Sequence, residues 1–259
     1  MAKGGADMGK IAEKSLVDGV RAVELHYRVI RDISSGQIAA YQSQTRLNSP
    51  KLGVLTPDKF RDVCEITNQA IRLFYLELIQ ALEAYKTFTE RELNFSWISV
   101  YMPVKLLKEQ GAEKKLLEYF SRYGVPTSRI CFELSEKLLA ETDGQAARVL
   151  QHLRNRGFHF MLVNFGGDTC PMMRLSGFSV DYVLLSPEVA NFLGNSERSD
   201  NAVKSIIGFV NDIGAEPIAD GVYNSRQAET LYSFECAYCA GSLAGKYMTE
   251  RYVRRKSDT

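Results

Sequence analysis

The stretch from residue 160 to residue 168 combines an apolar run with a polar, glycine-rich end. Phe160, Met161, Leu162 and Val163 are followed by Asn164-Phe165-Gly166-Gly167. This pattern predicts a buried strand that breaks into a tight loop. In barrel enzymes the catalytic groups lie at the carboxyl ends of strands. The end of this strand is therefore a candidate functional site.

The elements that must position this site follow from the alternation of strand-like and helix-like segments. Segments 25–33 and 38–47, joined by Ser34-Ser35-Gly36, predict a β-hairpin. Thr56-Pro57-Asp58 is typical of a helix start, and we expect one helix from there to about residue 86. The remaining predicted strands cover residues 95–102, 130–134, 159–165, 182–185, 216–222 and 237–245, and the remaining predicted helices cover 103–123, 144–156, 202–213 and 225–234.

This order of elements predicts one fold class. Short apolar strands that alternate with longer helices indicate a parallel sheet covered by helices. Eight strands in 259 residues match a (β/α)8 barrel in number and length. Because the chain opens with a hairpin, one strand must run antiparallel to the rest. We therefore predict an α/β fold, a TIM-like (β/α)8 barrel with one antiparallel strand, as a single domain over residues 22–259, preceded by an N-terminal extension over residues 1–21.

Four motifs occur along this barrel in a characteristic order. They are Ala40-Tyr41-Gln42-Ser43-Gln44-Thr45-Arg46, Leu55-Thr56-Pro57-Asp58-Lys59-Phe60, Phe132-Glu133-Leu134-Ser135-Glu136 and Ile218-Ala219-Asp220-Gly221-Val222-Tyr223. Their order and spacing resemble the EAL domain family of cyclic-di-GMP phosphodiesterases. The strand end Val163-Asn164-Phe165-Gly166 is similar to the family's Asp-Asp-Phe-Gly. The resemblance covers about residues 25–248 and implies a barrel of the EAL type.

The same resemblance implies a site in which carboxylates and an Asn bind divalent metal ions at the strand ends, completed by a Lys and a Glu. The corresponding positions in this sequence are Gln42, Tyr101, Glu133, Val163, Asn164, Leu184 and Asp220. Of the five carboxylates in the family pattern, one is kept, one is shortened to Asp and three are absent. The frame of the family is therefore better preserved here than its chemical groups.

The loss of these carboxylates predicts a degenerate site. Mg²⁺ and Mn²⁺ are hard cations that need oxygen ligands, and Val163 offers none. Tyr101 places a bulky phenol where the family has a small amide. Without a metal ion to lower the pKa of water, Asp220 alone is a weak base. We therefore expect no catalytic residue, no metal and no cofactor, and we predict a pseudo-enzyme of the family.

Arg46 is kept at a position where the resemblance implies a contact with a ligand phosphate. A guanidinium group can hold a phosphate by a bidentate contact. If cyclic-di-GMP binds, we expect Arg46, Gln44, Glu133 and Asp220 to contact it, although Gln44 replaces a family Leu beside the base. The alternative is structural: Arg46 pairs with Glu133 or another acid, and Asp220 with Gly221 forms a common strand-end turn.

Composition limits the partners that we expect. A formal net charge of +1 gives no electrostatic reason to bind nucleic acid or an anionic membrane. No apolar run approaches the roughly 18 residues that span a bilayer, and residues 1–14 lack the apolar core of a signal peptide. Five cysteines, among them Cys236 and Cys239, fit reduced thiols. We expect a cytoplasmic protein with neither nucleic-acid nor membrane partners.

Together these observations lead to a hypothesis about function. The chain is expected to be a catalytically inactive EAL-like protein that acts as a regulator or scaffold in bacterial signalling, through an unidentified protein partner. Two alternatives stay open: a non-hydrolytic cyclic-di-GMP receptor that binds the dinucleotide weakly, and a cyclic-di-GMP phosphodiesterase with an altered metal site. The resemblance also implies a homodimer formed along the fifth and sixth strands.

Overall fold

Eight strands close into a barrel in the computed structural model, which describes residues 16–17, 20–67, 69–140, 144–167 and 172–254. The ring closes because β3 pairs with both β4 and β11. In chain order the barrel strands are β3 (Val23–Asp32), β4 (Ile38–Ser49), β6 (Ile98–Tyr101), β7 (Ile130–Leu134), β8 (His159–Phe165), β9 (Tyr182–Leu185), β10 (Glu216–Ala219) and β11 (Tyr238–Cys239).

The direction of the strands confirms the predicted fold class. β3 runs antiparallel to β4 and to β11, whereas the other neighbouring pairs of the ring run parallel. The parallel strands therefore end on one side of the barrel, which is the side where a site is expected. Because β3 enters from that side, its first residues lie beside the ends of the parallel strands.

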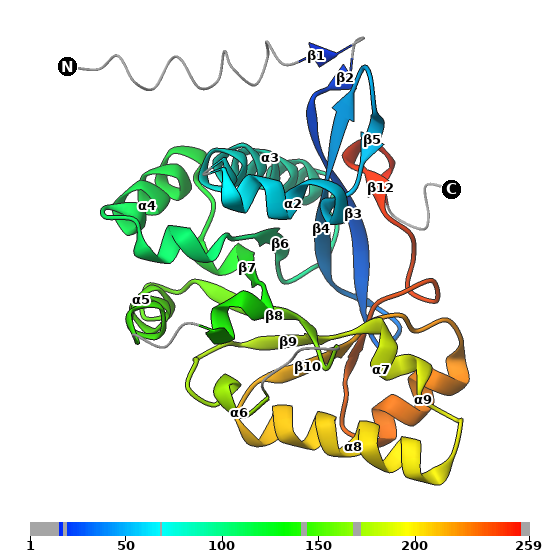
Figure 1. The fold of residues 1–259 in the computed structure, drawn as a ribbon. Helices are drawn as coiled ribbons and strands as arrows, with labels where there is room; N and C mark the ends of the chain where they lie inside the picture. Colours follow the sequence, from blue (N-terminus) through cyan, green and yellow to red (C-terminus); the bar gives the residue numbers. More distant parts are fainter. Residues whose placement is uncertain (1–15, 18–19, 68, 141–143, 168–171, 255–259) are drawn as a thin grey trace, which may run out of the picture.

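Helices surround the strands on the outside (Figure 1). The α-helices are α2 (Pro57–Ile66), α3 (Ala70–Glu90), α4 (Ala112–Tyr123), α5 (Gln145–Arg154), α6 (Met172–Leu175), α7 (Pro187–Asn191), α8 (Glu197–Asp212) and α9 (Ser225–Ser233). Short 3-10 helices are η1 (Val104–Lys108), η2 (Thr127–Arg129), η3 (Glu136–Ala140) and η4 (Glu250–Tyr252). Each segment that the sequence pattern marks as helical is thus at least partly helical.

The single helix predicted from Thr56 to about residue 86 is wrong, because the structure has two. α2 ends at Ile66, and the Thr67 hydroxyl donates a hydrogen bond to the Val63 carbonyl at 2.7 Å. The same carbonyl also accepts the Thr67 backbone N–H, and the next carbonyl, that of Cys64, accepts the Gln69 N–H at 3.1 Å, so the last turn closes at Thr67. α3 then begins at Ala70 and lies as a separate helix on the outside of the barrel (Figure 1).

Four very short strands were not predicted. β5 (Gly53–Leu55) pairs with β4, and β12 (Met248–Thr249) pairs with β3. β1 (Leu16–Val17) and β2 (Val20–Arg21) form a separate antiparallel pair within the segment expected to be an N-terminal extension. Two or three residues carry too little alternation to indicate a strand. The boundary between extension and barrel stays a prediction.

The hydrophobic core has two parts, separated by the barrel wall. The larger part lies between the strands and the surrounding helices, and the aromatic rings of Phe132 and Phe158 pack there. The smaller part fills the barrel and is built from Ile30, Ala40, Trp97, Cys131, Met161, Leu184, Ile218 and Ala240. Cys236 and Cys239 are buried free thiols, as expected, and burial raises the pKa of Cys236 to about 12.

Gly241 tests how tightly the end of the last barrel strand is packed. Its φ is +124°, and an added Cβ would lie 2.5 Å from the backbone nitrogen and oxygen of Val222. Gly241→Ala should therefore lower the free energy of unfolding by about 2 to 5 kcal/mol through strain and overlap. Gly208→Ala is the matched control, because Gly208 lies in α8 with open space at its Cβ position. It should raise stability by about 0.5 to 1 kcal/mol. Urea unfolding of both variants checks the pair, and equal effects would contradict this packing.

Candidate functional site at the barrel mouth

A cavity of about 560 Å³ opens where the parallel strands end. Its wall contains the seven positions that correspond to the metal-binding and catalytic groups implied by the family resemblance: Gln42, Tyr101, Glu133, Val163, Asn164, Leu184 and Asp220. Gln44 lines the same cavity. Arg46 is not among the lining residues, although it lies on the same strand as Gln44. The structure thus brings seven separated positions to one place.

Strand register explains how these side chains meet. Along a strand, alternate residues face the same side, so Gln42, Gln44 and Arg46 of β4 point one way. Arg28 of β3 stands directly opposite Gln42, and Tyr101 of β6 stands beside Glu133 of β7. Side chains at paired positions lie close enough to interact. The barrel therefore presents one ring of polar groups at its mouth.

Arg28, which the sequence analysis missed, lies at the centre of this ring. Its Nη1 and Nη2 donate to the two carboxylate oxygens of Asp220 at 2.9 and 2.6 Å. Its Nε and Nη2 donate to the Gln42 side-chain oxygen at 2.8 and 2.6 Å. The Arg28 side chain is only 12 % exposed and that of Asp220 only 13 %. Fork-shaped contacts of this kind are the strong class of charge-assisted hydrogen bonds.

Glu133 is a buried carboxyl in the same ring. Its Oε1 accepts a hydrogen bond from the Ser99 hydroxyl at 2.5 Å. Burial raises the pKa of Glu133, although its hydrogen bonds to Ser99 and Gln42 and the charge of Arg28 partly offset this. Glu133 is thus held by a local hydrogen bond at the end of its strand.

Arg46 does not pair with Glu133, so that part of the structural alternative is wrong. It donates to the Gln44 side-chain oxygen and to the Thr45 carbonyl, the latter at 3.3 Å. Its guanidinium lies 5.6 Å from the Tyr247 ring centroid. Burial lowers the pKa of Arg46, which means that its positive charge is poorly solvated. An anion at the mouth would stabilise this charge.

Tyr247 was also missed by the sequence analysis. Its ring lies 4.9 Å from Arg28 on one side of the site, and it lines the cavity. Burial raises the pKa of Tyr247 well above its ordinary range. Its position after the last barrel strand gave no signal, because no predicted element contains it. Two guanidinium groups thus approach one aromatic ring.

Tyr101 is held by a second buried ion pair behind the cavity. Arg61 of α2 stacks over the Tyr101 ring at 4.2 Å and bonds to Glu77 of α3 at 2.8 Å. Thr45 donates to the same Glu77 carboxylate at 2.5 Å, so β4, α2 and α3 meet there. Burial raises the pKa of Glu77 despite this pairing. The phenol predicted to crowd the metal position is therefore part of a fixed wall.

The end of β8, at Val163 and Asn164, contributes little polarity to the cavity. Val163 is half-buried, and Leu184 belongs to the apolar cluster inside the barrel. Asn164 is exposed and has a φ of +63°, a left-handed conformation that Asn tolerates better than most residues. The pairing of β8 with β9 is interrupted between Leu162 and Phe165. The break in the strand occurs at Asn164, where the sequence pattern places the loop.

The divalent metal ions implied by the family resemblance do not fit these donors. Both oxygens of Asp220 and the side-chain oxygen of Gln42 already accept hydrogen bonds from Arg28. In the described part of the chain, no group of three or more His, Cys, Asp or Glu side chains is arranged to hold a metal ion. Hard cations need several oxygen ligands free to converge on them. The positive charge that binds these oxygens is the Arg28 guanidinium.

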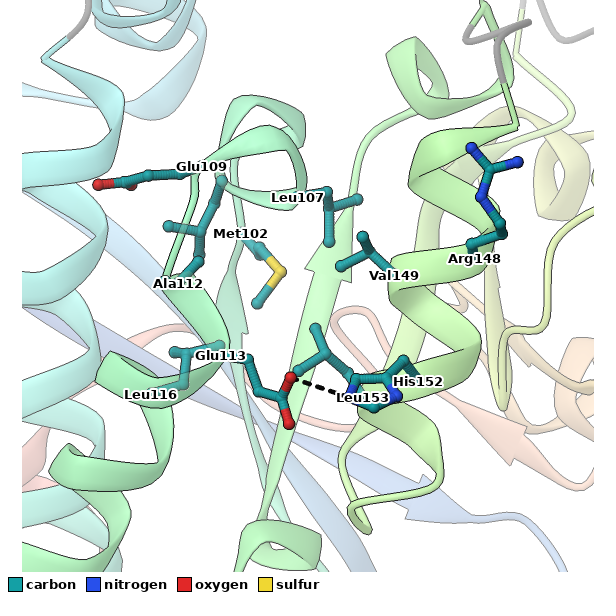
Figure 2. A pocket seen from close by; sticks show the side chains of 12 residues that line it. Met102, Leu107, Glu109, Ala112, Glu113, Leu116, Arg148, Val149, His152 and Leu153 are labelled. Atoms are coloured by element: carbon teal, nitrogen blue, oxygen red, sulfur yellow. Dashed lines mark ion pairs between the residues drawn. The ribbon is translucent and has the colours of Figure 1, made fainter.

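A second cavity lies outside the barrel, between η1, α4 and α5, and has a volume of about 280 Å³. Figure 2 shows Met102, Leu107 and Val149 facing the space between these elements. At one end Glu113 and His152 form an ion pair at 2.9 Å. None of the predicted site residues lines this cavity. We therefore place the candidate site at the barrel mouth.

The sequence and its fold were then compared with known proteins. A family profile of the EAL domain matches residues 14–247. The chain is 24 % identical over 247 residues to the cyclic di-GMP phosphodiesterase RocR of Pseudomonas aeruginosa, covering 92 % of this chain and 62 % of RocR. It is 23 % identical over 230 residues to the cyclic di-GMP phosphodiesterase PdeB of Shewanella oneidensis, covering 86 % of this chain and 26 % of PdeB.

A solved structure shares the fold. The complex of the PaMucR phosphodiesterase with c-di-GMP superposes with a TM-score of 0.79 at 18 % identity, covering 94 % of this chain and 96 % of that one. The fold is therefore that of an EAL-type barrel. Because the family profile matches most of the sequence, the chain belongs to the EAL domain family. It is an EAL domain of the cyclic-di-GMP signalling family, and it spans less than two thirds of RocR and about a quarter of PdeB.

These relatives contradict the prediction that the chain is a pseudo-enzyme. RocR and PdeB, which it matches over most of its length, are both named as phosphodiesterases. The prediction, which rested on the missing carboxylates and on the Tyr101 phenol at the metal position, is therefore wrong. The oxygens of Gln42 and Asp220 determine which cation the barrel mouth can hold. They do not decide whether the chain is an enzyme.

A membrane span was tested in the same structure. Among the described residues, no helix combines the length and the apolar character needed to cross a bilayer. This agrees with the absence of a long apolar run in the sequence.

The buried Glu133 carboxyl predicts a pH dependence of stability. Because burial raises its pKa in the folded state, the folded protein binds this proton more readily than the unfolded chain. The free energy of unfolding should therefore rise as pH falls from 7 toward the ordinary Glu range, and this gain is lost as pH rises through the raised pKa. Glu133→Gln should flatten the dependence, leaving the contributions of Glu77 and Glu83, whose pKa values burial also raises. Melting temperatures at pH 5, 6 and 7 measure it.

The control for this experiment is Glu197→Gln, because Glu197 is exposed on α8. This variant should keep the pH dependence of the wild type. An unchanged dependence in Glu133→Gln would show that Glu133 does not titrate as its burial requires.

Proposed function

We propose that this chain is a regulatory EAL domain that binds cyclic-di-GMP at the barrel mouth and acts on a protein partner. The observation that carries the proposal is that the guanidinium groups of Arg28 and Arg46 both lie near the Tyr247 ring, 4.9 and 5.6 Å from its centroid. These groups lie beside a cavity of about 560 Å³. Ligand pockets in proteins commonly have volumes of roughly 300 to 1,000 Å³.

The chemistry of these groups suits a cyclic dinucleotide. Cyclic-di-GMP carries two phosphates and two purine bases. Guanidinium groups bind phosphate through paired hydrogen bonds, and aromatic rings stack on bases. Arg46 has a poorly solvated charge that a phosphate would stabilise, and Gln44 beside it offers an amide for base or ribose contacts. The named relatives and the PaMucR complex support the choice of this ligand.

A route from the mouth to a partner is offered by α2. Its inner face carries Arg61, which lines the cavity and contacts Tyr101 and Glu77. Its outer face exposes Val63 and Ile66, which are 60 % and 79 % exposed. Large exposed apolar side chains close together often mark contact surfaces. A ligand that moves Arg61 would move the helix that presents this face.

Titration calorimetry with cyclic-di-GMP tests the ligand. The wild type should bind it, and Arg46→Ala should weaken binding by about 10- to 100-fold, because a charge-assisted contact to phosphate is lost. Arg129→Ala is the matched control, since Arg129 lies at the start of β7, at the opposite end of the barrel. It should leave the affinity unchanged.

The same samples should be assayed for the linear dinucleotide, in buffers with and without manganese. Release of the product would show that binding at this mouth leads to turnover. Absence of binding in the wild type, or an equal loss in Arg129→Ala, would contradict the proposed ligand site.

The partner surface is tested by Ile66→Glu. This change adds a charge to the exposed face of α2 and should abolish capture of the partner from the native cytoplasm, while calorimetry shows unchanged cyclic-di-GMP affinity. Tyr232→Glu is the control, because Tyr232 is also exposed, 52 %, but lies on α9. Loss of capture in both variants, or in neither, would contradict a contact through α2. Sedimentation of the purified chain shows whether the partner is a second copy.

A further inference from the structure

We propose that the Arg28 guanidinium is the permanent cation of the barrel mouth and excludes divalent metal ions from it. This inference deepens the proposed function and relies on it only for the identity of the ligand. The first step is the location of Arg28. It stands opposite Gln42 in the β3–β4 register and donates two hydrogen bonds to the Gln42 side-chain oxygen and two across the mouth to Asp220, which follows β10.

The second step concerns the oxygens that a metal ion would need. Asp220 gives one oxygen to each terminal nitrogen of Arg28, and Gln42 gives its single oxygen to two N–H groups. The Oδ1 of Asp220 accepts a further hydrogen bond from the backbone N–H of Gly221 at 2.6 Å. Mg²⁺ demands near-octahedral oxygen ligands at short distances. These oxygens cannot converge on a metal ion while Arg28 holds them.

The third step concerns what would have to happen for a metal ion to enter. Arg28 would have to leave Asp220, and its side chain is 12 % exposed beneath Tyr247. Removing one partner from a buried ion pair leaves an uncompensated charge, which is strongly unfavourable. Val163 and Leu184 line the same cavity and supply no oxygen that could replace the lost ones. The guanidinium and a divalent ion therefore compete for one position. The guanidinium has the advantage because it is part of the chain and does not have to bind from solution.

Removal of Arg28 should open this position. In Arg28→Ala, Asp220, Gln42 and Glu133 keep their oxygens at the mouth but lose the cation that holds them. Titration with Mn²⁺ alone, followed by calorimetry or electron paramagnetic resonance, should show affinity at least about tenfold higher than in the wild type. Arg46→Ala is the matched control: it removes the same charge near the same mouth, but Arg46 donates to Gln44 and to the Thr45 carbonyl rather than to Asp220 or Gln42. It should not gain Mn²⁺ affinity.

Two outcomes of this titration would overturn the inference. One is Mn²⁺ binding by the wild type as tight as that of Arg28→Ala. The other is an equal gain in Arg46→Ala, which would assign the effect to general charge rather than to the vacated position.

A measurement on the wild type alone covers the case in which Arg28→Ala does not fold. Cyclic-di-GMP affinity is measured in EDTA and again in Mn²⁺. Equal affinities are expected, because Arg28 already provides the cation. Binding that occurs only with Mn²⁺ would overturn this inference while supporting the proposed ligand, whereas absence of binding in both buffers would overturn the proposed function.

Discussion

The ion pair between Arg28 and Asp220 organises the whole barrel mouth. It joins β3, the one antiparallel strand, to the end of β10, and through Gln42 it also joins β4. β3 closes the ring because it pairs on both sides. An arginine on this strand can therefore reach carboxyl-terminal groups on both sides of the closure. Because both charges are largely shielded from water, their separation would be costly, and the surrounding side chains are fixed around them.

A second buried pair fixes the opposite wall in the same way. Arg61 and Glu77 connect α2 with α3, and Thr45 attaches both to β4. In both pairs, Arg28–Asp220 and Arg61–Glu77, a half-buried arginine bonds to a carboxylate that is buried or nearly buried. Each arginine also contacts an aromatic ring that lines the cavity: Arg28 contacts Tyr247 and Arg61 contacts Tyr101. The mouth is thus a polar ring joined to α2, the helix that also presents the exposed Val63 and Ile66.

Much of the barrel could be predicted from the sequence, because its strands are separated by clear turn signals. The predicted segments 159–165 and 182–185 coincide with β8 and β9, and the predicted hairpin matches β3 and β4. The break between α2 and α3 escaped prediction because helical spacing continues across it, and a local cap at Thr67 decides the end. Short strands such as β5 and β12 form only because a neighbouring strand is present to pair with them.

The candidate site was predicted in its positions but not in its interactions. Motif resemblance located Gln42, Glu133 and Asp220, which line one cavity. Arg28 lies outside those motifs, and only the β3–β4 register shows that it faces Gln42. If Arg28 is not considered, Gln42, Glu133 and Asp220 resemble the remainder of a metal site that has lost its other ligands. The prediction of a pseudo-enzyme follows from that view. When Arg28 is considered, the oxygens of Gln42 and Asp220 accept hydrogen bonds from a guanidinium, while Glu133 accepts one from Ser99.

A guanidinium in place of a metal ion, as proposed here, would alter what the site can offer a ligand. A metal ion is a mobile double charge whose occupancy depends on its concentration, whereas Arg28 is a single charge fixed in direction by its fork of N–H groups. A phosphate that binds beside Tyr247 would lie near both Arg28 and Arg46, whether or not a divalent metal ion is in solution. Ligand binding by such a site is governed by the geometry of two side chains. Membership of the EAL domain family and the proposed role of Arg28 as the cation of the mouth are therefore separate matters, because the first rests on the sequence as a whole and the second on a few contacts.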